Sequence, residues 1–190
     1  MPNFRVVVLA SGAGTLFTAL AKQADQIGIQ IVGLVTDAEV PACDRARELG
    51  IPVSIVPLLE DRVKWDQSLA TEISRLKPSL IVSAGFMKIL GPVVLRFYQG
   101  KIINTHPALL PNFPGAHAVR DALAAGVSET GSTIHFVDKG VDTGEVIAQV
   151  VVKVEPDDTE ESLHERIKEV ERELLVTTVS EIAQGKVTLK

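Results

Sequence analysis

The feature that most constrains this sequence is an apolar, β-branched run that ends in a glycine-rich turn and continues into a helical pattern. Residues 4–10 read FRVVVLA, residues 11–15 read SGAGT, and apolar side chains recur at helical spacing over residues 16–20. This order predicts a strand, a tight turn and a helix. A strand that is apolar on both faces is typical of a parallel sheet covered by helices on both sides.

The alternation of strands and helices continues along the chain and predicts the α/β class. We expect further strands at residues 29–36, 53–56, 80–84, 101–105, 132–137 and 146–154. We expect helices at residues 43–49, 61–76, 92–97, 119–125 and 159–183. The last two strands are expected to pair as a hairpin-like extension of the sheet.

The last helix carries two further expectations. A capping box formed by Asp158 and Glu161 should open it. Its buried stripe should consist of Leu163, Ile167, Val170 and Leu174.

Composition narrows the function. A chain of 190 residues with 46% hydrophobic residues can bury the core of one compact domain. A net charge of −5 argues against a broad surface for nucleic acid or anionic membrane, so we expect neither partner. One cysteine cannot form an intramolecular disulfide, and residues 6–10 are too short to span a membrane. We therefore expect a cytoplasmic protein.

The glycine turn is the first candidate site. Backbone N–H groups at the start of a helix suit an anion such as phosphate. The dinucleotide fingerprint G-x-G-x-x-G is only partly met, because Phe17 occupies the third glycine position, although Asp37 lies beyond the second strand. The residues leave two readings open: a phosphate site, or glycines that only shape the turn.

A second candidate is Asn104 with His106, which project to the same face at the carboxyl end of a strand. An amide donor beside a titratable group suits a developing oxyanion, although the histidine can instead cap a loop. Asp142, in a glycine-flanked turn, is functional only if His106 is its partner, and otherwise forms an Asx turn. A nearby carboxylate would raise the pKa of His106. His135 alternates with apolar neighbours on a strand, and we expect it to be structural or to line a pocket.

Metal and covalent chemistry are not predicted. Cys43 stands alone, and the chain has neither H-E-x-x-H nor C-x-x-C spacing. No G-x-S-x-G elbow follows a strand.

Five motifs together resemble the folate-dependent phosphoribosylglycinamide formyltransferase family. In chain order they are SGAG at 11–14, AGFMKIL at 84–90, NTHPALLP at 104–111, PG at 114–115 and VDTG at 141–144. The resemblance covers essentially the whole chain. It implies one formyltransferase domain over residues 1–190, with a Rossmann-like three-layer open sheet, mostly parallel with an antiparallel C-terminal extension. The nucleotide phosphate site would lie in the N-terminal half, and the folate and catalytic site toward the C-terminal half.

The implied activity is transfer of a formyl group from 10-formyltetrahydrofolate to the amine of glycinamide ribonucleotide in de novo purine synthesis. The folate would be a co-substrate, both substrates would be small molecules, and no metal would be needed. The resemblance leaves the oligomeric state open, with a homodimer among the options.

The resemblance also assigns residues. The catalytic group would be Asn104, His106 and Asp142, with Asn104 also contacting the folate. The phosphate would be bound by Gly12, Ala13, Gly14 and Thr15, and the nucleotide by Glu171. The folate would be bound by Arg62, Phe86, Met87, Lys88, Ile89 and Leu90, with Arg62 and Lys88 toward its glutamate tail.

Three residues depart from the family pattern. Leu16 stands where many members have an asparagine, so an amide expected near the phosphate is missing. Glu145 replaces a common proline, and Lys88 a frequent arginine. None of these departures touches the catalytic group.

Other functions stay open. A sugar-nucleotide formyltransferase or a formyltetrahydrofolate hydrolase would share the core, although the hydrolase would carry an extra N-terminal regulatory domain. A methionyl-tRNA formyltransferase would need a further RNA-binding domain. A non-catalytic dinucleotide-binding module would use Gly12, Gly14 and Asp37 and give His106 no role.

Overall fold

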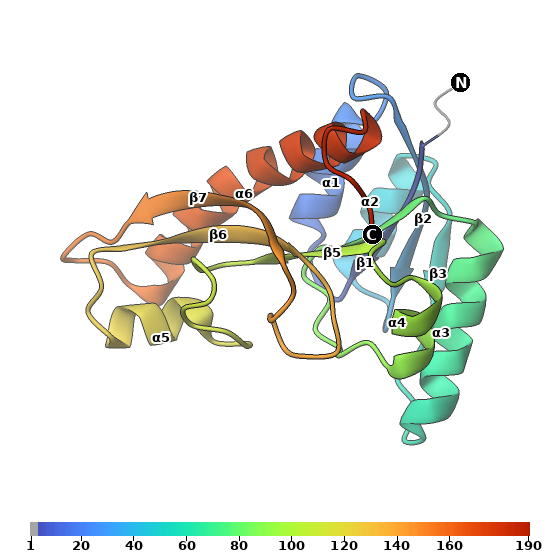
Figure 1. Cartoon of the computed structure of the whole chain (residues 1–190), viewed down its shortest axis with the longest axis horizontal. Helices are drawn as coiled ribbons and strands as arrows, with labels where there is room; N and C mark the ends of the chain where they lie inside the picture. The colour runs from blue at the N-terminus through green and yellow to red at the C-terminus, as the bar shows by residue number, and fades with distance from the viewer. Residues whose placement is uncertain (1–3) are drawn as a thin grey trace.

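A computed structural model describes residues 4–190, and over these residues seven strands form one sheet in the order β3-β2-β1-β4-β5-β6-β7 (Figure 1). The strands are β1 (Phe4–Ala10), β2 (Ile29–Thr36), β3 (Val53–Ile55), β4 (Leu80–Ser83), β5 (Ile102–His106), β6 (Glu129–Phe136) and β7 (Val146–Lys153). The first five strands pair in parallel, whereas β6 pairs antiparallel with both β5 and β7. The predicted α/β class and mixed sheet are confirmed.

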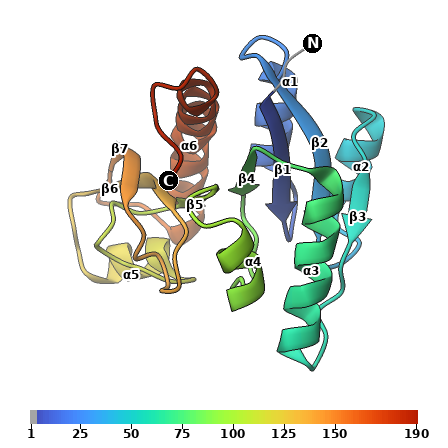
Figure 2. The same cartoon turned by 45° about the vertical axis from the view of Figure 1, so that its right-hand side comes forward.

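Helices cover both faces of the parallel strands, as the apolar run in β1 predicts. The helices are α1 (Thr15–Gln23), α2 (Pro41–Glu48), α3 (Arg62–Leu76), α4 (Pro92–Phe97), α5 (Ala118–Ala124) and α6 (Glu160–Ala183). In β1, Val6 and Val8 belong to the core cluster beneath α1, α2 and α6, whereas Val7 and Leu9 pack with Trp65 beneath α3 and α4. Figure 2 shows α3 and α4 on the opposite side of β1 from α1.

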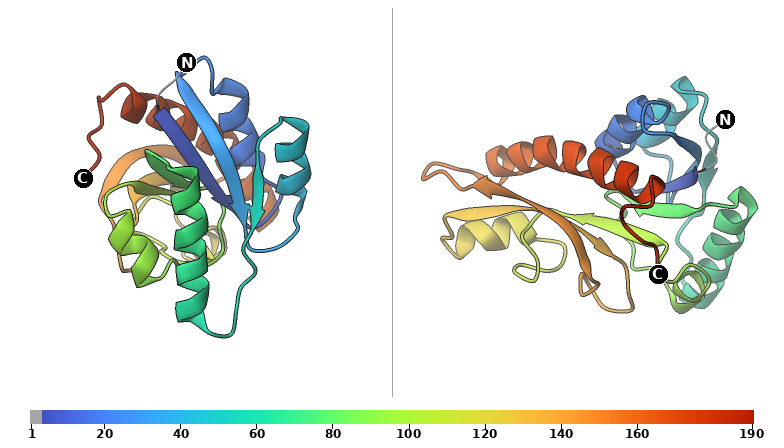
Figure 3. Two further views of the ribbon diagram at one scale, coloured as in Figure 1. Left: turned by 90° about the vertical axis from the view of Figure 1, so that its right-hand side faces the viewer. Right: turned by 45° about the horizontal axis from the view of Figure 1, so that its top comes forward.

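The long helix α6 crosses the antiparallel strands and then packs against α1 (Figure 3). Its N-cap is Thr159, which forms a capping box with Ser162. The predicted pair of Asp158 and Glu161 is wrong by one position, because the Asp158 carboxylate instead binds the Arg166 guanidinium at 2.6 Å. None of the helices in residues 4–190 is both long and apolar enough to cross a membrane.

The buried stripe of α6 also differs from the prediction. After Leu163 and Ile167 it continues through Glu171 and Leu175 rather than Val170 and Leu174. The structure therefore buries a carboxylate where hydrophobic periodicity alone selects a neighbouring apolar residue.

Strand β6 begins three residues earlier than predicted, at Glu129, because its polar start still pairs with the end of β7. The two strands form the long extension seen in Figure 1. The carboxyl ends of β1, β2, β4 and β5 meet at one edge of the sheet. From β1 the chain adds β2 and β3 on one side of the sheet and then β4 and β5 on the other side, so the strand order reverses between β1 and β4. In open α/β sheets, ligands bind at such a switch point.

Candidate active site

A cavity of about 690 Å³ opens at this edge of the sheet. We call residues 11–15 the glycine turn and residues 84–90 the β4–α4 loop. The predicted site residues that line the cavity are Gly12, Ala13, Gly14, Thr15, Phe86, Met87, Lys88, Ile89, Leu90, Asn104, His106, Asp142 and Glu171. Arg62 does not line it. Its guanidinium donates to the Ile89 carbonyl at 2.8 Å, so it supports the β4–α4 loop from outside.

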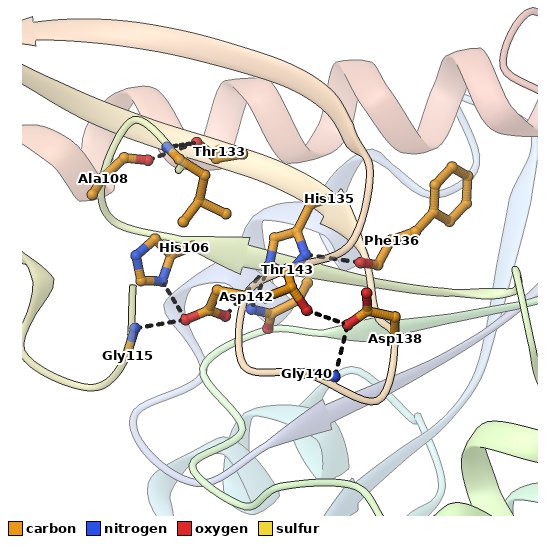
Figure 4. A network of polar contacts seen from close by, with 12 residues as sticks. His106, Ala108, Gly115, Thr133, His135, Phe136, Asp138, Gly140, Asp142 and Thr143 are labelled. Carbon is orange, nitrogen blue, oxygen red and sulfur yellow. Dashed lines mark hydrogen bonds and ion pairs between the residues drawn. The ribbon is translucent and has the colours of Figure 1, made fainter. Parts of the chain in front are cut away.

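His106 and Asp142 meet inside the cavity (Figure 4). The His106 side chain, at the end of β5, is buried, and its Nδ1 lies 3.3 Å from Asp142 Oδ2. The Gly115 N–H donates to the same carboxylate oxygen at 2.8 Å. The Phe113 carbonyl lies 2.8 Å from His106 Nε2, which donates to it. Asp142 thus has the histidine partner that its functional reading requires.

Two residues of this group have left-handed backbones. Asp142 has φ of 53°, a conformation that aspartate tolerates, but Phe113 has φ of 52°, which a bulky residue rarely adopts. Such conformations cost roughly 1–3 kcal/mol and persist where the surrounding structure holds them. Here, the strained residue is the one whose carbonyl binds His106.

The two ionisable groups are shifted in the same direction. Burial lowers the pKa of His106, and although the Phe113 carbonyl and Asp142 oppose this, the pKa stays below 6.5. The predicted rise is therefore wrong, because desolvation outweighs the carboxylate. His135, the Gly115 N–H and His106 hold the pKa of Asp142 below its ordinary value against the effect of burial. Asp142 is thus a carboxylate near neutral pH, ready to stabilise a proton on His106.

His135 belongs to the same group and lines the cavity, which is one of the two roles that we expected for it. His135 Nδ1 lies 2.8 Å from the Phe136 carbonyl oxygen, and its Nε2 lies 3.2 Å from the Asn104 amide nitrogen and 3.5 Å from Asp142 Oδ1. This contact of the amide nitrogen with His135 fixes the orientation of the Asn104 amide. The missing signal was strand register, because Asn104 and His135 are direct cross-strand partners.

The glycine turn leaves helix donors free. α1 begins without a side-chain cap, so the first N–H groups of the helix can bind an anion. Gly14 is the N-cap with φ of 72°, and a Cβ at this position would lie 2.6 Å from the Ala42 Cβ. Glycine is therefore required at position 14, whereas a Cβ on Gly12 would meet open space.

Glu171 approaches the cavity from α6. It is 5% exposed and accepts a hydrogen bond from Ser132 Oγ at 3.0 Å. Burial raises the pKa of Glu171, while the Ser132 hydrogen bond opposes that rise. His164 and Lys168 also line this side of the cavity, which the sequence reasoning missed. The cavity therefore adjoins one buried acceptor that can bind hydroxyl groups.

The β4–α4 loop presents an apolar surface. Met87 is 63% exposed and Ile89 is 68% exposed, whereas Phe86 is buried and lies 6.3 Å from the Trp65 ring in a stacked arrangement. The Lys88 ammonium binds the Asp37 carboxylate at 3.1 Å, and Lys88 also lines the cavity.

The described residues also bear on cofactors. Within residues 4–190 no three histidine, cysteine, aspartate or glutamate side chains gather into a metal-binding group. Asp37, the acidic residue that a dinucleotide-binding module would use, is already bound by Ser11 and Lys88. The Asp37 carboxylate is therefore engaged in contacts within the protein.

Comparison with known proteins gives consistent results. Residues 4–179 match the model of the family described as formyl transferase. The chain is 47% identical to the phosphoribosylglycinamide formyltransferase of Mycobacterium tuberculosis (strain ATCC 25618 / H37Rv), over 97% of this chain and 87% of that protein. It is 37% identical to the trifunctional purine biosynthetic protein adenosine-3 of Drosophila pseudoobscura pseudoobscura, over 97% of this chain and 14% of that protein. The crystal structure of glycinamide ribonucleotide transformylase 1 from Symbiobacterium toebii is similar, with a TM-score of 0.95 at 32% identity, covering 98% of this chain and 91% of that chain.

Proposed function

This chain belongs to the formyl transferase family, and from that premise we propose that it transfers a formyl group from 10-formyltetrahydrofolate to the amine of glycinamide ribonucleotide, in purine synthesis. The observation that carries the proposal is one cavity that joins an uncapped helix N-terminus to a buried amide, histidine and aspartate. The first suits a phosphate, and the second suits acyl transfer.

The two substrates enter from different sides. The ribonucleotide phosphate binds the N–H groups of residues 12–15, and Glu171 accepts hydrogen bonds from hydroxyl groups of the nucleotide. The folate ring packs on the apolar side chains of the β4–α4 loop, with Arg62 near its charged tail. This arrangement brings the amine of one substrate and the formyl group of the other to Asn104 and His106.

The reaction adds the amine nitrogen to the formyl carbon and places negative charge on the formyl oxygen. The second N–H of the Asn104 amide donates to that oxygen, because the first is held by His135. In the free protein, the His106 Nε2–H donates to the Phe113 carbonyl. During the reaction, this N–H donates to the formyl oxygen instead. Asp142 accepts the amine proton through water, and that proton then passes to the folate nitrogen that leaves.

A product assay tests the proposal. The purified protein is incubated with 10-formyltetrahydrofolate and, in separate reactions, with glycinamide ribonucleotide, an amino sugar nucleotide or water alone. Tetrahydrofolate release that requires glycinamide ribonucleotide supports the proposal. Release with the sugar nucleotide, or with water alone, would instead identify a sugar-nucleotide formyltransferase or a hydrolase.

A further inference from the structure

Three loops meet beside the cavity, and one carboxylate joins them. Asp37, which follows β2, accepts from Ser11 Oγ at 2.5 Å through Oδ1 and binds Lys88 Nζ at 3.1 Å through Oδ2. Ser11 Oγ in turn accepts from the Met87 N–H at 3.0 Å. The Ser11 N–H donates to the Gly85 carbonyl at 3.1 Å. The glycine turn and the β4–α4 loop are therefore tied together both directly and through Asp37.

These contacts are sheltered from water. The side chain of Asp37 is 11% exposed and that of Lys88 is 27% exposed, so this pair is screened less than an ion pair on the open surface. Burial alone would raise the pKa of Asp37, but the Ser11 hydroxyl and Lys88 hold that pKa below its ordinary value. The carboxylate thus keeps its charge, and each of its oxygens has a partner.

The glycine turn also contacts the start of α2. The Ala42 N–H donates to the Gly12 carbonyl at 3.2 Å, and Gly14 lies against Ala42. The start of α2 therefore supports the glycine turn at two points. The contact at Asp37, on the segment between β2 and α2, also extends to the β4–α4 loop through the Lys88 side chain.

We propose that Asp37 and Lys88 form a strut that holds the β4–α4 loop at a fixed distance from the glycine turn, so that each loop is preorganised for its own substrate. The inference rests on the proposed function, in which the turn binds phosphate and the loop binds folate. Lys88 is then a positioning residue that acts through Asp37, not a ligand of the folate tail. Transfer between two bound molecules needs the reacting atoms about 3–3.5 Å apart, which makes a fixed separation useful.

The strut has a distinct kinetic signature. Without it, a smaller fraction of molecules holds each loop in its binding geometry, and apparent affinity falls by that fraction for each substrate. Asp37→Asn keeps the shape of the side chain but removes its charge. We expect it to raise KM by about tenfold for both substrates, with kcat changed less than about twofold because saturating substrates restore the loops.

Lys88→Met should show the same signature, and the double variant should be no worse than the poorer single variant, because the residues act as one unit. Lys88→Arg should restore near-normal KM values, because it keeps the charge facing Asp37. Glu39→Gln is the matched control: it lies on the same segment, but its carboxylate forms an exposed pair with Arg47. It should leave both KM values unchanged.

Hydrogen–deuterium exchange of the substrate-free protein tests the strut without relying on activity. Lys88→Met should speed exchange in residues 11–15, to which Lys88 is linked through Asp37, and Asp37→Asn should speed it in both loops. Glu39→Gln should change neither. If wild-type protein fails to turn over the two substrates, the proposed function falls while exchange still decides the strut. Unchanged exchange in the glycine turn of Lys88→Met, or a KM change confined to folate, would overturn the strut.

Discussion

The two sides of the cavity differ in how many polar side chains they bury. Among the described residues, the parallel strands β1 to β4 and their helices bury few polar side chains, namely Thr36, Asp66 and Ser83. Asp66 accepts hydrogen bonds from backbone N–H groups at the start of α4, which is a structural task. From β5 onward, the buried polar side chains are Thr105, His106, Thr130, Ser132, Thr133, His135, Glu171 and Thr178.

This contrast separates binding from chemistry. The parallel side offers main-chain N–H groups and apolar surface, which recognise a phosphate or a ring without needing a titratable group. The other side, from β5 onward, offers His106, Asp142 and Glu171, whose pKa values the site shifts. Variants on the parallel side should therefore act mainly on KM, and variants of the catalytic group mainly on kcat.

The largest expected effect is a loss of kcat on the chemical side of the cavity, at His106 and Asp142. His106→Ala and Asp142→Asn should each lower kcat by about 10²-fold or more, the scale of general acid–base catalysis. Because the two side chains act as one unit, the double variant should be little worse than His106→Ala alone. Steady-state kinetics with both substrates saturating measures this, and losses that multiply would refute the shared role.

The variant Asp142→Asn also tests the direction of the pKa shift of His106. Asp142 raises the pKa of His106 against the stronger effect of burial, so Asp142→Asn should lower that pKa further below 6.5. A histidine titration followed by NMR reads this directly.

The second prediction breaks the binding side. Gly14→Ala forces a Cβ to 2.6 Å from the Ala42 Cβ in a left-handed backbone, so the turn must move. KM for the ribonucleotide should rise by about tenfold, with kcat and folate KM nearly unchanged. Thermal stability should fall, whereas Gly12→Ala, whose Cβ meets open space, should keep wild-type stability. An equal rise in both KM values would refute the assignment of the phosphate to this turn.

The same contrast explains what the sequence could predict. Apolar periodicity within β1 and the spacing of turn residues are local, so the order of elements and the mixed sheet were predicted correctly. Contacts between distant segments are not local. The contact of His135 with Asn104 depends on strand register, and the partner of Lys88 depends on where β2 ends. The pKa of His106 was predicted with the wrong sign because the sequence does not reveal the extent of its burial.

The third prediction concerns the outer support of the β4–α4 loop. The Arg62 guanidinium lies 4.3 Å from the centre of the Trp65 ring and donates to the Ile89 carbonyl. Arg62→Ala should weaken folate binding by about fivefold, and the loss should shrink in high salt if the guanidinium also meets the folate tail. Arg62→Lys is the matched control, because it keeps charge near the tail but loses the stacked fork. Folate binding measured by calorimetry at two salt concentrations distinguishes tail contact from loop support.

The smallest expected effect joins the two sides, because Glu171 is a buried carboxylate to which the proposed function gives a binding role. Its pKa is raised above the ordinary 4.5, so the folded state favours the protonated form. The stability that this group contributes is fully present below the unfolded pKa and is lost as the pH rises through the folded pKa. Glu171→Gln removes the charge while leaving an oxygen for the Ser132 hydroxyl. It should therefore raise the melting temperature by a few degrees near neutral pH, and by progressively less toward about pH 4.

The same change should impair binding, because the amide has one acceptor oxygen where the carboxylate has two. KM for the ribonucleotide should rise by about threefold with kcat unchanged, so stability and function move in opposite directions. The exposed Glu173→Gln, two residues along α6, controls for the loss of one charge and should alter neither quantity. If Glu171→Gln lowered the melting temperature at neutral pH, the ionised carboxylate would be a stabilising partner in the folded protein, and its burial would have to be offset by Lys168 and Arg172, the two charges that oppose its raised pKa.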